Sequence, residues 1–250
     1  MGEPGVRLRF DEDLRFFLAA RHRRSDAVLV PSDGTSTAGH LVTSLGVPLT
    51  EVGALTLGGR TIPASYRPGD GDVIDVAAVS RPQPMPPGPP LRFVLDVHLG
   101  TLARRLRLLG VDTAYANDAA DEELIEQANA QDRVLLTQDR GLLRRNTLQS
   151  GGYVRGARPD QQLTDVLERF APKLAPWTRC VACNGVLQAV PKSDVEDSLQ
   201  PGTRRTYQEF ARCPDCGRVY WRGAHNPRLQ RIVAAARAAV TSAEDQARGT

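Results

Sequence analysis

A run of prolines near position 85 divides the chain more sharply than any other feature of its 250 residues. Residues 80–90 read SRPQPMPPGPP, with six prolines in eleven positions. Proline fixes φ and has no amide hydrogen to donate, so this stretch cannot continue a helix or lie inside a sheet. We expect an extended linker over residues 81–90, with a separately folded unit on each side.

The segment before the prolines, residues 1–80, has the pattern of a small α+β unit. Residues 36–46 predict a helix with a hydroxyl cap and a terminal glycine. Gly58 and Gly59, between two apolar runs, indicate a hairpin. The other expected strands are VRLRF (6–10), AVLV (27–30) and VIDVAAV (73–79). These elements predict a sheet crossed by one helix.

Residues 91–175 alternate between apolar strands and amphipathic helices. The first pair is the strand RFVLDV and a helix over residues 99–110, whose apolar residues recur at helical spacing. The next strands are VDTAYAN, RVLLTQD and GYVRG, and the next helices are DEELIEQANAQD, GLLRRNTL and DQQLTDVLERFA. Strands that alternate with helices are joined by right-handed crossovers into a mainly parallel sheet. The predicted fold class is α/β, with helices flanking the sheet.

Carboxylates follow two of these strands. Asp96 comes directly after Phe93-Val94-Leu95, and Asp139 comes just past RVLLT, while DAADEE (118–123) opens the helix between them. Ligands of open parallel sheets bind beyond the carboxyl ends of the strands. Carboxylates gathered there repel one another unless a divalent cation binds, and Mg²⁺ prefers a few carboxylates with water and phosphate oxygens. This pattern predicts an acidic metal site.

Each carboxylate also has a simpler explanation. Asp121 could only cap its helix, and Asp139 could be a turn residue before Gly141. Asp96 is harder to explain in this way, because a capping aspartate seldom follows three apolar strand residues directly. His98 is expected to be a structural histidine rather than a substrate contact. The spacing alone therefore indicates a metal site without identifying a substrate.

All four cysteines occur in two C-x-x-C pairs, each with a glycine close behind. This spacing is typical of a zinc site. Two disulfides are the alternative, but a chain without an export signal should stay reduced. Four thiolates leave no open coordination position, so the zinc should be structural. We predict a zinc ribbon over residues 176–226, with the ligands Cys180, Cys183, Cys213 and Cys216.

Aromatic and basic residues surround the second cysteine pair. They could stack on bases and hold phosphates, or Tyr220 and Trp221 could form a small ribbon core. The other residues of this kind are Arg204, Arg205, Tyr207 and Phe210. Asn226 and Pro227 predict the start of a C-terminal helix over residues 227–250. Its apolar stripe should pack on the body of the protein and consists of Leu229, Ile232, Val233, Ala236 and Val240.

Residues 93–145, from FVLDVHLGTLARRL to LLTQDRGLLRR, resemble the PIN-like Mut-seven C-terminal RNase domain family. Members read as strand-Asp, a Leu-Gly-x-Leu-Ala-Arg helix, a central acidic pair and Leu-Leu-Thr-x-Asp, and the likeness continues to about residue 226. The resemblance implies a nuclease that binds Mg²⁺ or Mn²⁺ and cleaves RNA. Carried over by position, the catalytic metal ligands are Asp96, Asp121 and Asp139, with Thr137 supporting the last. Candidate phosphate contacts near them in sequence are Arg104, Arg140 and Arg144.

The chain departs from the family pattern at two positions. Arg105 stands where members often have Trp, and Gln138 where they often have Arg. Both could alter substrate contacts. A fourth acidic ligand has only weak candidates in Asp118 and Asp160.

Residues 6–79 resemble the ubiquitin-like β-grasp domain often fused in front of this family. The likeness rests on GHLVTSLGVPLTEVGALTLGGR (39–60) and YRPGDGDVIDV (66–76). Sulfur carriers of this fold act through a free C-terminal Gly-Gly, whereas this chain runs on into the prolines. The resemblance therefore favours the docking of a protein partner or a substrate.

The sequence as a whole predicts a cytoplasmic, metal-dependent ribonuclease. Two alternatives are a non-catalytic RNA-binding or adaptor protein, which would use the ribbon and the ubiquitin-like unit, and a nuclease that acts on DNA. The net charge of +3 gives only a modest attraction for nucleic acid. No apolar run approaches the length of a membrane span, and the first residues lack a signal-peptide pattern.

Overall fold

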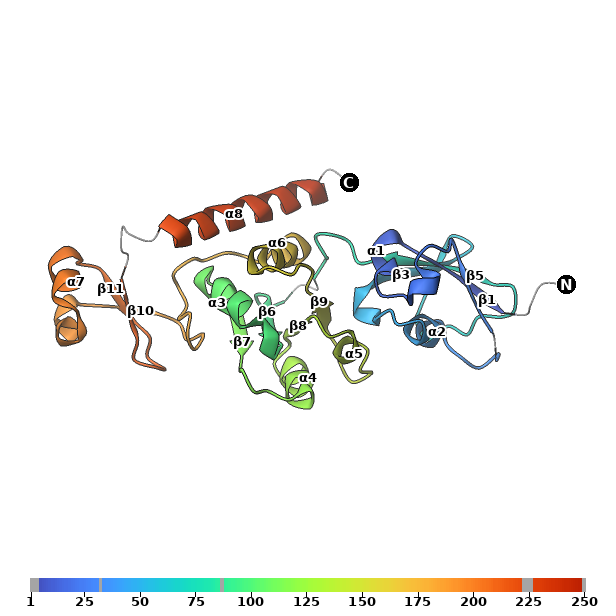
Figure 1. Cartoon of the computed structure of the whole chain (residues 1–250), viewed down its shortest axis with the longest axis horizontal. Helices are drawn as coiled ribbons and strands as arrows, with labels where there is room; N and C mark the ends of the chain where they lie inside the picture. The colour runs from blue at the N-terminus through green and yellow to red at the C-terminus, as the bar shows by residue number, and fades with distance from the viewer. Residues whose placement is uncertain (1–4, 32, 86–87, 222–226, 249–250) are drawn as a thin grey trace.

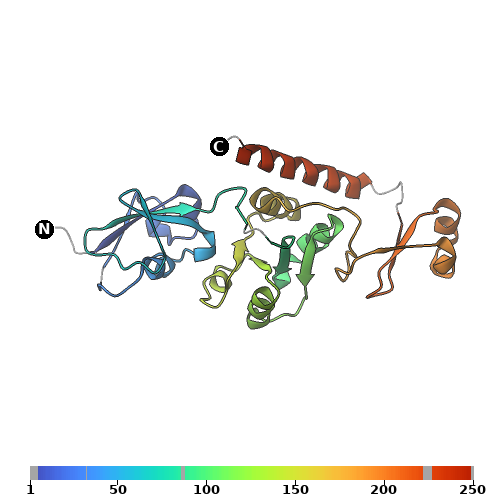
Figure 2. The same cartoon turned by 180° about the vertical axis from the view of Figure 1, so that it is seen from behind.

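The computed structural model describes residues 5–31, 33–85, 88–221 and 227–248 (Figure 1). An N-terminal unit, a central unit and a cysteine-containing ribbon follow one another along the molecule. A long C-terminal helix runs beside the central unit, as Figure 2 shows from behind.

The N-terminal unit is a five-stranded sheet with one main helix. Its strand order is β2-β1-β5-β3-β4, with β1 parallel to β5 and the other pairs antiparallel. The strands are β1 (Val6–Phe10), β2 (Val28–Val30), β3 (Val52–Leu57), β4 (Arg60–Ile62) and β5 (Val73–Ala78). Helix α2 (Ala38–Ser44) is capped by the Thr37 hydroxyl, which confirms the predicted helix. Three short elements were not predicted: α1 (Glu12–Arg15), η1 (Ala20–His22) and η2 (Leu49–Glu51).

The central unit is a four-stranded parallel sheet in the order β7-β6-β8-β9. Its strands are β6 (Arg92–Leu95), β7 (Asp112–Tyr115), β8 (Val134–Thr137) and β9 (Gly151–Tyr153). Its helices are η3 (Val97–Leu99), α3 (Gly100–Leu108), α4 (Asp121–Ala130), α5 (Arg140–Leu143) and α6 (Pro159–Phe170). The predicted α/β fold is thus confirmed.

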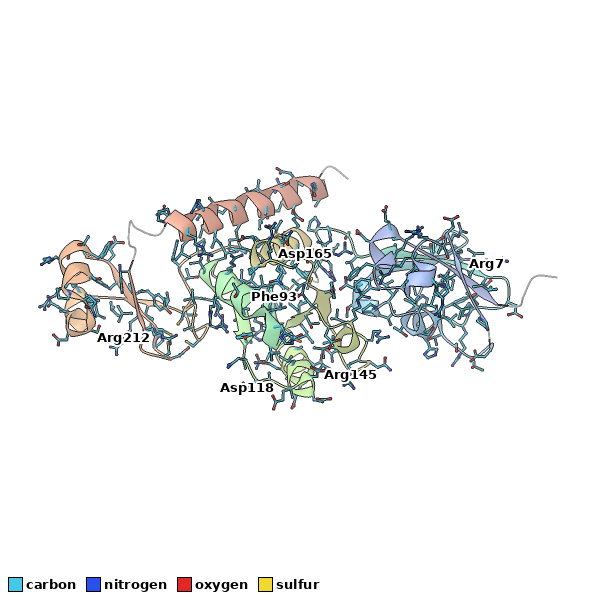
Figure 3. All side chains as sticks on the ribbon, viewed as in Figure 1. Arg7, Phe93, Asp118, Arg145, Asp165 and Arg212 are labelled. Atoms are coloured by element: carbon cyan, nitrogen blue, oxygen red, sulfur yellow. The ribbon has the colours of Figure 1, made fainter. Side chains whose placement is uncertain are left out.

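Helices cover both faces of this sheet, which explains why its strands read as continuous apolar runs. Phe93 and Leu95 of β6 pack with α3 and α6, while Val94 packs on the opposite face with α4 and α5. Figure 3 labels Phe93 below α6, where its ring centroid lies 5.3 Å from that of Phe170. The chain leaves β6 toward one face and β8 toward the other. The crevice between these two strands is the switch point where open α/β sheets bind ligands.

The ribbon has three antiparallel strands in the order β10-β11-β12. They are β10 (Gln188–Val190), β11 (Phe210–Arg212) and β12 (Val219–Trp221), and the loop between the first two contains η4 (Lys192–Asp194), η5 (Glu196–Ser198) and α7 (Pro201–Thr206). Helix α8 (Pro227–Arg248) packs its predicted apolar stripe on the central core, with Val233 and Ala236 fully inside. The expected cap at Asn226 lies outside the described residues. Among the helices that the structure describes, none is long and apolar enough to cross a membrane.

A buried ion pair, the Glu51–Arg169 clasp, joins the N-terminal and central units. Glu51 is 2% exposed and Arg169 only 1%. Arg169 Nη1 donates to both carboxylate oxygens of Glu51, at 2.8 and 2.9 Å, and Nη2 donates to Thr50 O at 3.0 Å. The backbone amide of Tyr153, on edge strand β9, donates to Glu51 Oε1 at 2.8 Å. The N-terminal unit therefore covers one edge of the central sheet.

The start of the proline-rich stretch also lies against the central unit. Arg81 forms an ion pair with Asp165 of α6 at 2.7 Å, and the amide of Gln83 donates to Arg169 O at 2.6 Å. Residues 86–87 of the expected linker lie outside the described residues, and the predicted domain boundaries remain a proposal. In its first part, the stretch fixes the two units together rather than only spacing them apart.

Candidate active site and metal centre

Asp96 lies at the centre of the carboxyl edge of the parallel sheet. Its amide donates to Leu136 O at 3.0 Å, which extends the pairing of β6 with β8 by one step. Its side chain is buried, and Oδ2 accepts a 2.5 Å hydrogen bond from the hydroxyl of Thr137. The same hydroxyl accepts from the amide of Asp139 at 2.8 Å. Thr137 thus fixes the Asp96 carboxylate and the start of the loop that carries Asp139.

Asp139 is exposed and caps a short helix. Its Oδ1 accepts from the amides of Gly141, at 2.6 Å, and Leu142, at 3.3 Å, at the start of α5. The alternative that Asp139 is a turn residue before Gly141 therefore accounts for its Oδ1 atom. Within the described part of the chain, Oδ2 has no hydrogen-bond partner, so this oxygen is free for another ligand.

Asp121 is the first residue of α4 rather than its cap, which is Ala120. The cap is completed by Glu123, whose Oε2 accepts from the amide of Ala120 at 3.0 Å. A carboxylate in the first turn is favoured by the helix dipole. The capping explanation of Asp121 is therefore wrong, and its half-buried side chain lies in the first turn of α4.

The three aspartates share one edge of the sheet without forming a compact cluster. In the described ranges, the four cysteines are the only group of three or more metal-binding side chains with all ligand atoms within 4.8 Å of one another. No arginine, lysine or histidine in those ranges forms an ion pair with Asp96, Asp121 or Asp139. Carboxylates that no side-chain cation neutralises are suited to a hard divalent cation. Their assignment as metal ligands stays a prediction.

The three arginines expected near this edge have different surroundings. Arg104, on α3, and Arg144, just after α5, are exposed. The guanidinium of Arg140 instead lies over the ring of Phe16 in the N-terminal unit, 4.0 Å from its centroid. The contact joins residues that are far apart in sequence, so no local pattern indicates it. Phosphate binding by these arginines stays a prediction.

Arg105 and Gln138, the two residues that depart from the family pattern, both make contacts that stabilise the local fold. Arg105 is buried and forms a 2.7 Å ion pair with Asp160, one of the weak candidates for a fourth ligand. Gln138 Nε2 donates to Val154 O and Gly156 O, both at 2.9 Å, and so ties the loop after β8 to the chain after β9. The other weak candidate, Asp118, is exposed beside α4 (Figure 3). His98 is exposed as well.

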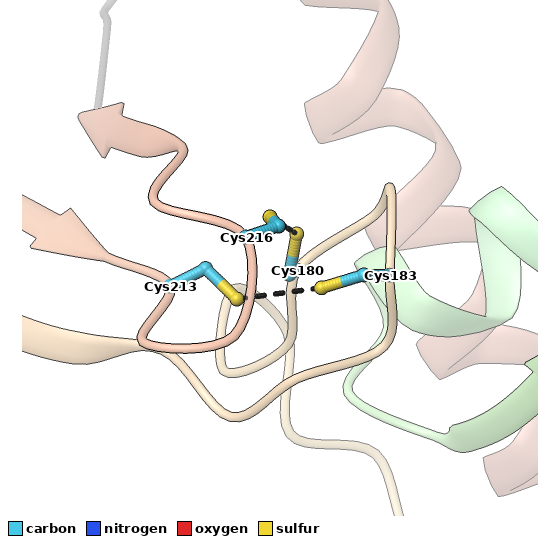
Figure 4. A group of neighbouring side chains, drawn as sticks. All are labelled: Cys180, Cys183, Cys213 and Cys216. Atoms are coloured by element: carbon cyan, nitrogen blue, oxygen red, sulfur yellow. Dashed lines mark hydrogen bonds between the residues drawn. The ribbon is translucent and has the colours of Figure 1, made fainter.

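The four cysteines converge on one point (Figure 4). The sulfur atoms of Cys180 and Cys216 lie 3.6 Å apart, and those of Cys183 and Cys213 lie 3.4 Å apart. Tetrahedral zinc with Zn–S bonds of about 2.3 Å requires S–S separations of about 3.8 Å. The donor set and its spacing therefore fit one structural Zn²⁺, as the sequence predicted.

Tight turns and a tyrosine shape this thiol cluster. Both C-x-x-C turns are closed by backbone hydrogen bonds, such as Cys180 N to Gly185 O at 2.8 Å and Gly217 N to Cys213 O at 2.9 Å. The Tyr220 hydroxyl lies 3.0 Å from Cys180 Sγ. Burial raises the pKa of Cys180, but hydrogen bonds from Tyr220 and the backbone outweigh it and lower that pKa to about 6. The Tyr220 hydroxyl therefore favours the thiolate form of Cys180, which is the form that binds metal.

The first C-x-x-C turn is anchored to the other edge strand of the central sheet. Asn184 Oδ1 accepts from the amide of Thr113 on β7 at 2.9 Å, and its Nδ2 donates to Asp112 at 2.8 Å. Buried Arg107 donates to Ala182 O at 2.7 Å and to Thr113 O at 2.8 Å. The ribbon thus covers β7 as the N-terminal unit covers β9.

The sequence left open whether the aromatic residues of the ribbon stack on bases or form a small core, and the structure shows residues of both kinds. Phe210 is buried, and Tyr220 contacts a cysteine, so both belong to the ribbon core. Trp221 is 42% exposed, and its ring centroid lies 6.4 Å from that of Tyr207. Trp221 therefore remains accessible to a ligand, beside the half-buried Tyr207.

The parallel sheet, the carboxylates at its switch point and the ribbon packed on its edge together have the features of an α/β nuclease. A family model described as the Mut7-C RNAse domain matches residues 91–233, and one described as Mut7-C ubiquitin matches residues 3–84. The chain therefore belongs to the Mut7-C RNAse domain family and carries the ubiquitin-like domain in front of it. Comparison with curated proteins and with solved structures gives no match.

Proposed function

We propose that this protein is a metal-dependent ribonuclease that hydrolyses phosphodiester bonds of RNA at the edge formed by Asp96, Asp121 and Asp139. The family match indicates a nuclease. The observation that carries the finer proposal is the buried Asp96 carboxylate, held by Thr137 at the switch point and paired with no cation in the described residues. Burying a carboxylate in this way is costly unless a positive ligand binds it.

The donor set fits Mg²⁺ or Mn²⁺, which bind carboxylate oxygens together with water and phosphate oxygens. A cation bound there would supply an activated water and stabilise the charge on the phosphate. Thr137 holds one oxygen of Asp96 in place, and the capping bonds of Asp139 orient its free Oδ2. Asp121, at the positive end of α4, would complete the ligand set.

The basic side chains nearby would bind the substrate. Arg104, Arg140 and Arg144 are candidate phosphate contacts beside the acidic edge, where they would attract a polyanion. Zinc bound to the four cysteines would be structural, because four thiolates fill its coordination sphere. The ribbon that it holds together would help to place RNA.

The direct test incubates the full chain and its Asp96→Asn variant with labelled RNA and labelled DNA, in Mn²⁺ or in EDTA. We expect the wild type to cleave RNA in Mn²⁺ only, and the variant to cleave at least a hundredfold more slowly. Asp132→Asn is the matched control. Asp132 is exposed at the opposite end of β8, and its φ of 48° is one that asparagine readily adopts.

The possible results separate the proposed function from its rivals. RNA cleavage that is equal in wild type and Asp96→Asn would contradict the proposed site. RNA binding without cleavage would indicate the adaptor alternative, and metal-dependent cleavage of DNA alone would indicate a DNA nuclease.

A further inference from the structure

The geometry points to a nucleotide-binding surface that the ubiquitin-like domain contributes to the nuclease edge, with Phe16 stacking on a base of single-stranded RNA and Arg140 holding its phosphate. This inference rests on the proposed function for the identity of the substrate. It assigns the N-terminal domain a part in binding the substrate, in addition to covering the sheet.

Phe16 lies against the carboxyl edge of the central sheet. Arg140, which covers its ring, directly follows the candidate ligand Asp139. The ring of Tyr153, the last residue of β9, lies 5.3 Å from Phe16 and 5.4 Å from Phe17. Both contacts therefore come from the ends of strands β8 and β9, the side of the sheet that carries the acidic residues.

Phe16 is unusual among these aromatic residues because it remains open to solvent. Its side chain is 42% exposed, although Arg140, Phe17 and Tyr153 all pack against it, whereas Phe17 is only 3% exposed. Phe17 also contacts Tyr153, so the domain contact does not depend on Phe16 alone. The exposed part of the Phe16 ring is apolar surface next to a cation, which is the combination that binds single-stranded nucleic acid.

The position of this surface is fixed by contacts on both sides. The Glu51–Arg169 clasp holds η2 on β9, and Arg155 donates to the carboxylate of Asp13 at 2.7 Å and to Asp13 O at 2.9 Å. Asp13 is three residues before Phe16 in the same segment. A rigid aromatic surface loses little conformational freedom when a base stacks on it, so it can contribute directly to binding.

The chemistry favours a single strand over a duplex. A base can stack on Phe16 only when its own face is free, as in unpaired RNA. Arg140 lies over one face of the ring and keeps its planar donors for a phosphate oxygen, a geometry that guanidinium groups adopt often. A duplex offers phosphates to Arg140 but no base to Phe16.

The test measures binding without cleavage, in buffer without added divalent cations, with the full chain carrying Asp96→Asn, so that zinc bound to the cysteines is retained. Single-stranded RNA oligomers with 5-iodouridine at successive positions are photo-crosslinked to the protein, and the crosslinked peptide is identified by mass spectrometry. Binding of the same oligomer, single-stranded or annealed to its complement, is followed by fluorescence anisotropy. Phe16→Leu keeps an apolar side chain at the contact but removes the ring, and Phe16→Trp restores an aromatic ring. Leu29→Ala is the control, because Leu29 is 37% exposed on β2 at the far edge of the same domain sheet.

We expect a crosslink at Phe16, and a loss of single-strand affinity of about fivefold or more in Phe16→Leu, with duplex affinity unchanged. Phe16→Trp should restore binding, and Leu29→Ala should not alter it. The inference is overturned if crosslinks map only to other peptides, such as the one containing Trp221, or if Phe16→Leu weakens both forms of RNA equally. A Phe16 crosslink, together with a wild type that never cleaves RNA in Mn²⁺, would overturn the proposed function and support this inference. Cleavage of RNA by the wild type, together with unchanged RNA binding by Phe16→Leu, would support the proposed function and overturn this inference.

Discussion

Replacing Arg169 by methionine should destabilise the protein far more than any exposed substitution at the same domain contact. The change leaves Glu51, which is 2% exposed, with the Tyr153 amide as its remaining hydrogen-bond donor, and it leaves Thr50 O without its partner. Removing one member of a buried ion pair costs about 3–5 kcal/mol, because the other charge is left buried and uncompensated. That is a large share of a typical stability of about 5–15 kcal/mol.

Urea unfolding followed by circular dichroism measures this loss, and hydrogen exchange at the Tyr153 amide shows whether the domain contact opens. Arg155→Ala is the matched control. Its ion pair with Asp13 spans the same contact, but the two side chains are 34% and 54% exposed, so we expect a loss of only about 0.2–1 kcal/mol.

A double variant tests whether the unpaired charge on Glu51 causes the loss of stability in Arg169→Met. Adding Glu51→Gln to Arg169→Met removes the uncompensated carboxylate and keeps an acceptor for Tyr153, so the double variant should be more stable than Arg169→Met alone. The reasoning is refuted if Arg169→Met costs no more than Arg155→Ala, or if Glu51→Gln brings no recovery.

Three further predictions concern the site and the ribbon. Thr137→Val removes the hydroxyl that holds Asp96, so kcat on labelled RNA should fall about ten- to a hundredfold, and an unchanged kcat would contradict the assigned role. Cys213→Ser should lower the zinc content, measured by elemental mass spectrometry, from the one ion per chain expected of the wild type. Asn184→Ala loses the bond from Thr113 and places alanine at a φ of 77°, so thermal unfolding should show a loss of about 2–3 kcal/mol. Asn184→Gly, which relieves only the backbone strain, should recover part of it.

The features that could be predicted from sequence are those with a local signal. The apolar runs of β6 and β8 identify strands covered on both faces, and the paired cysteines identify the ribbon by their spacing alone. The position of Asp96 follows from the same logic, since a carboxylate directly after a buried strand must lie at the edge of the sheet. Short elements such as α1 and α7 give too few residues for a periodic pattern, and they were missed.

Contacts between distant segments had no signal of this kind. Glu51 reads as an ordinary charged residue after a helix, and Arg169 as one on a helix face, yet the pair is buried between two units. The stacking of Phe16 on Arg140 is hidden for the same reason. Contacts of this type depend on how two folded units pack against each other, and the residues adjacent in sequence carry no information about that packing.

The Glu51–Arg169 clasp also affects the order in which parts of the chain can pack during synthesis. Glu51 and Arg169 are separated by 118 residues, so at about 5–20 residues per second Arg169 is synthesised about 6–24 s after Glu51. Throughout that interval the N-terminal domain can fold, but Glu51 lacks the cation that pairs with it. The charge on Glu51 opposes its burial against any surface that lacks a cation. We therefore expect stable burial of Glu51 only after the last turn of α6 has brought Arg169.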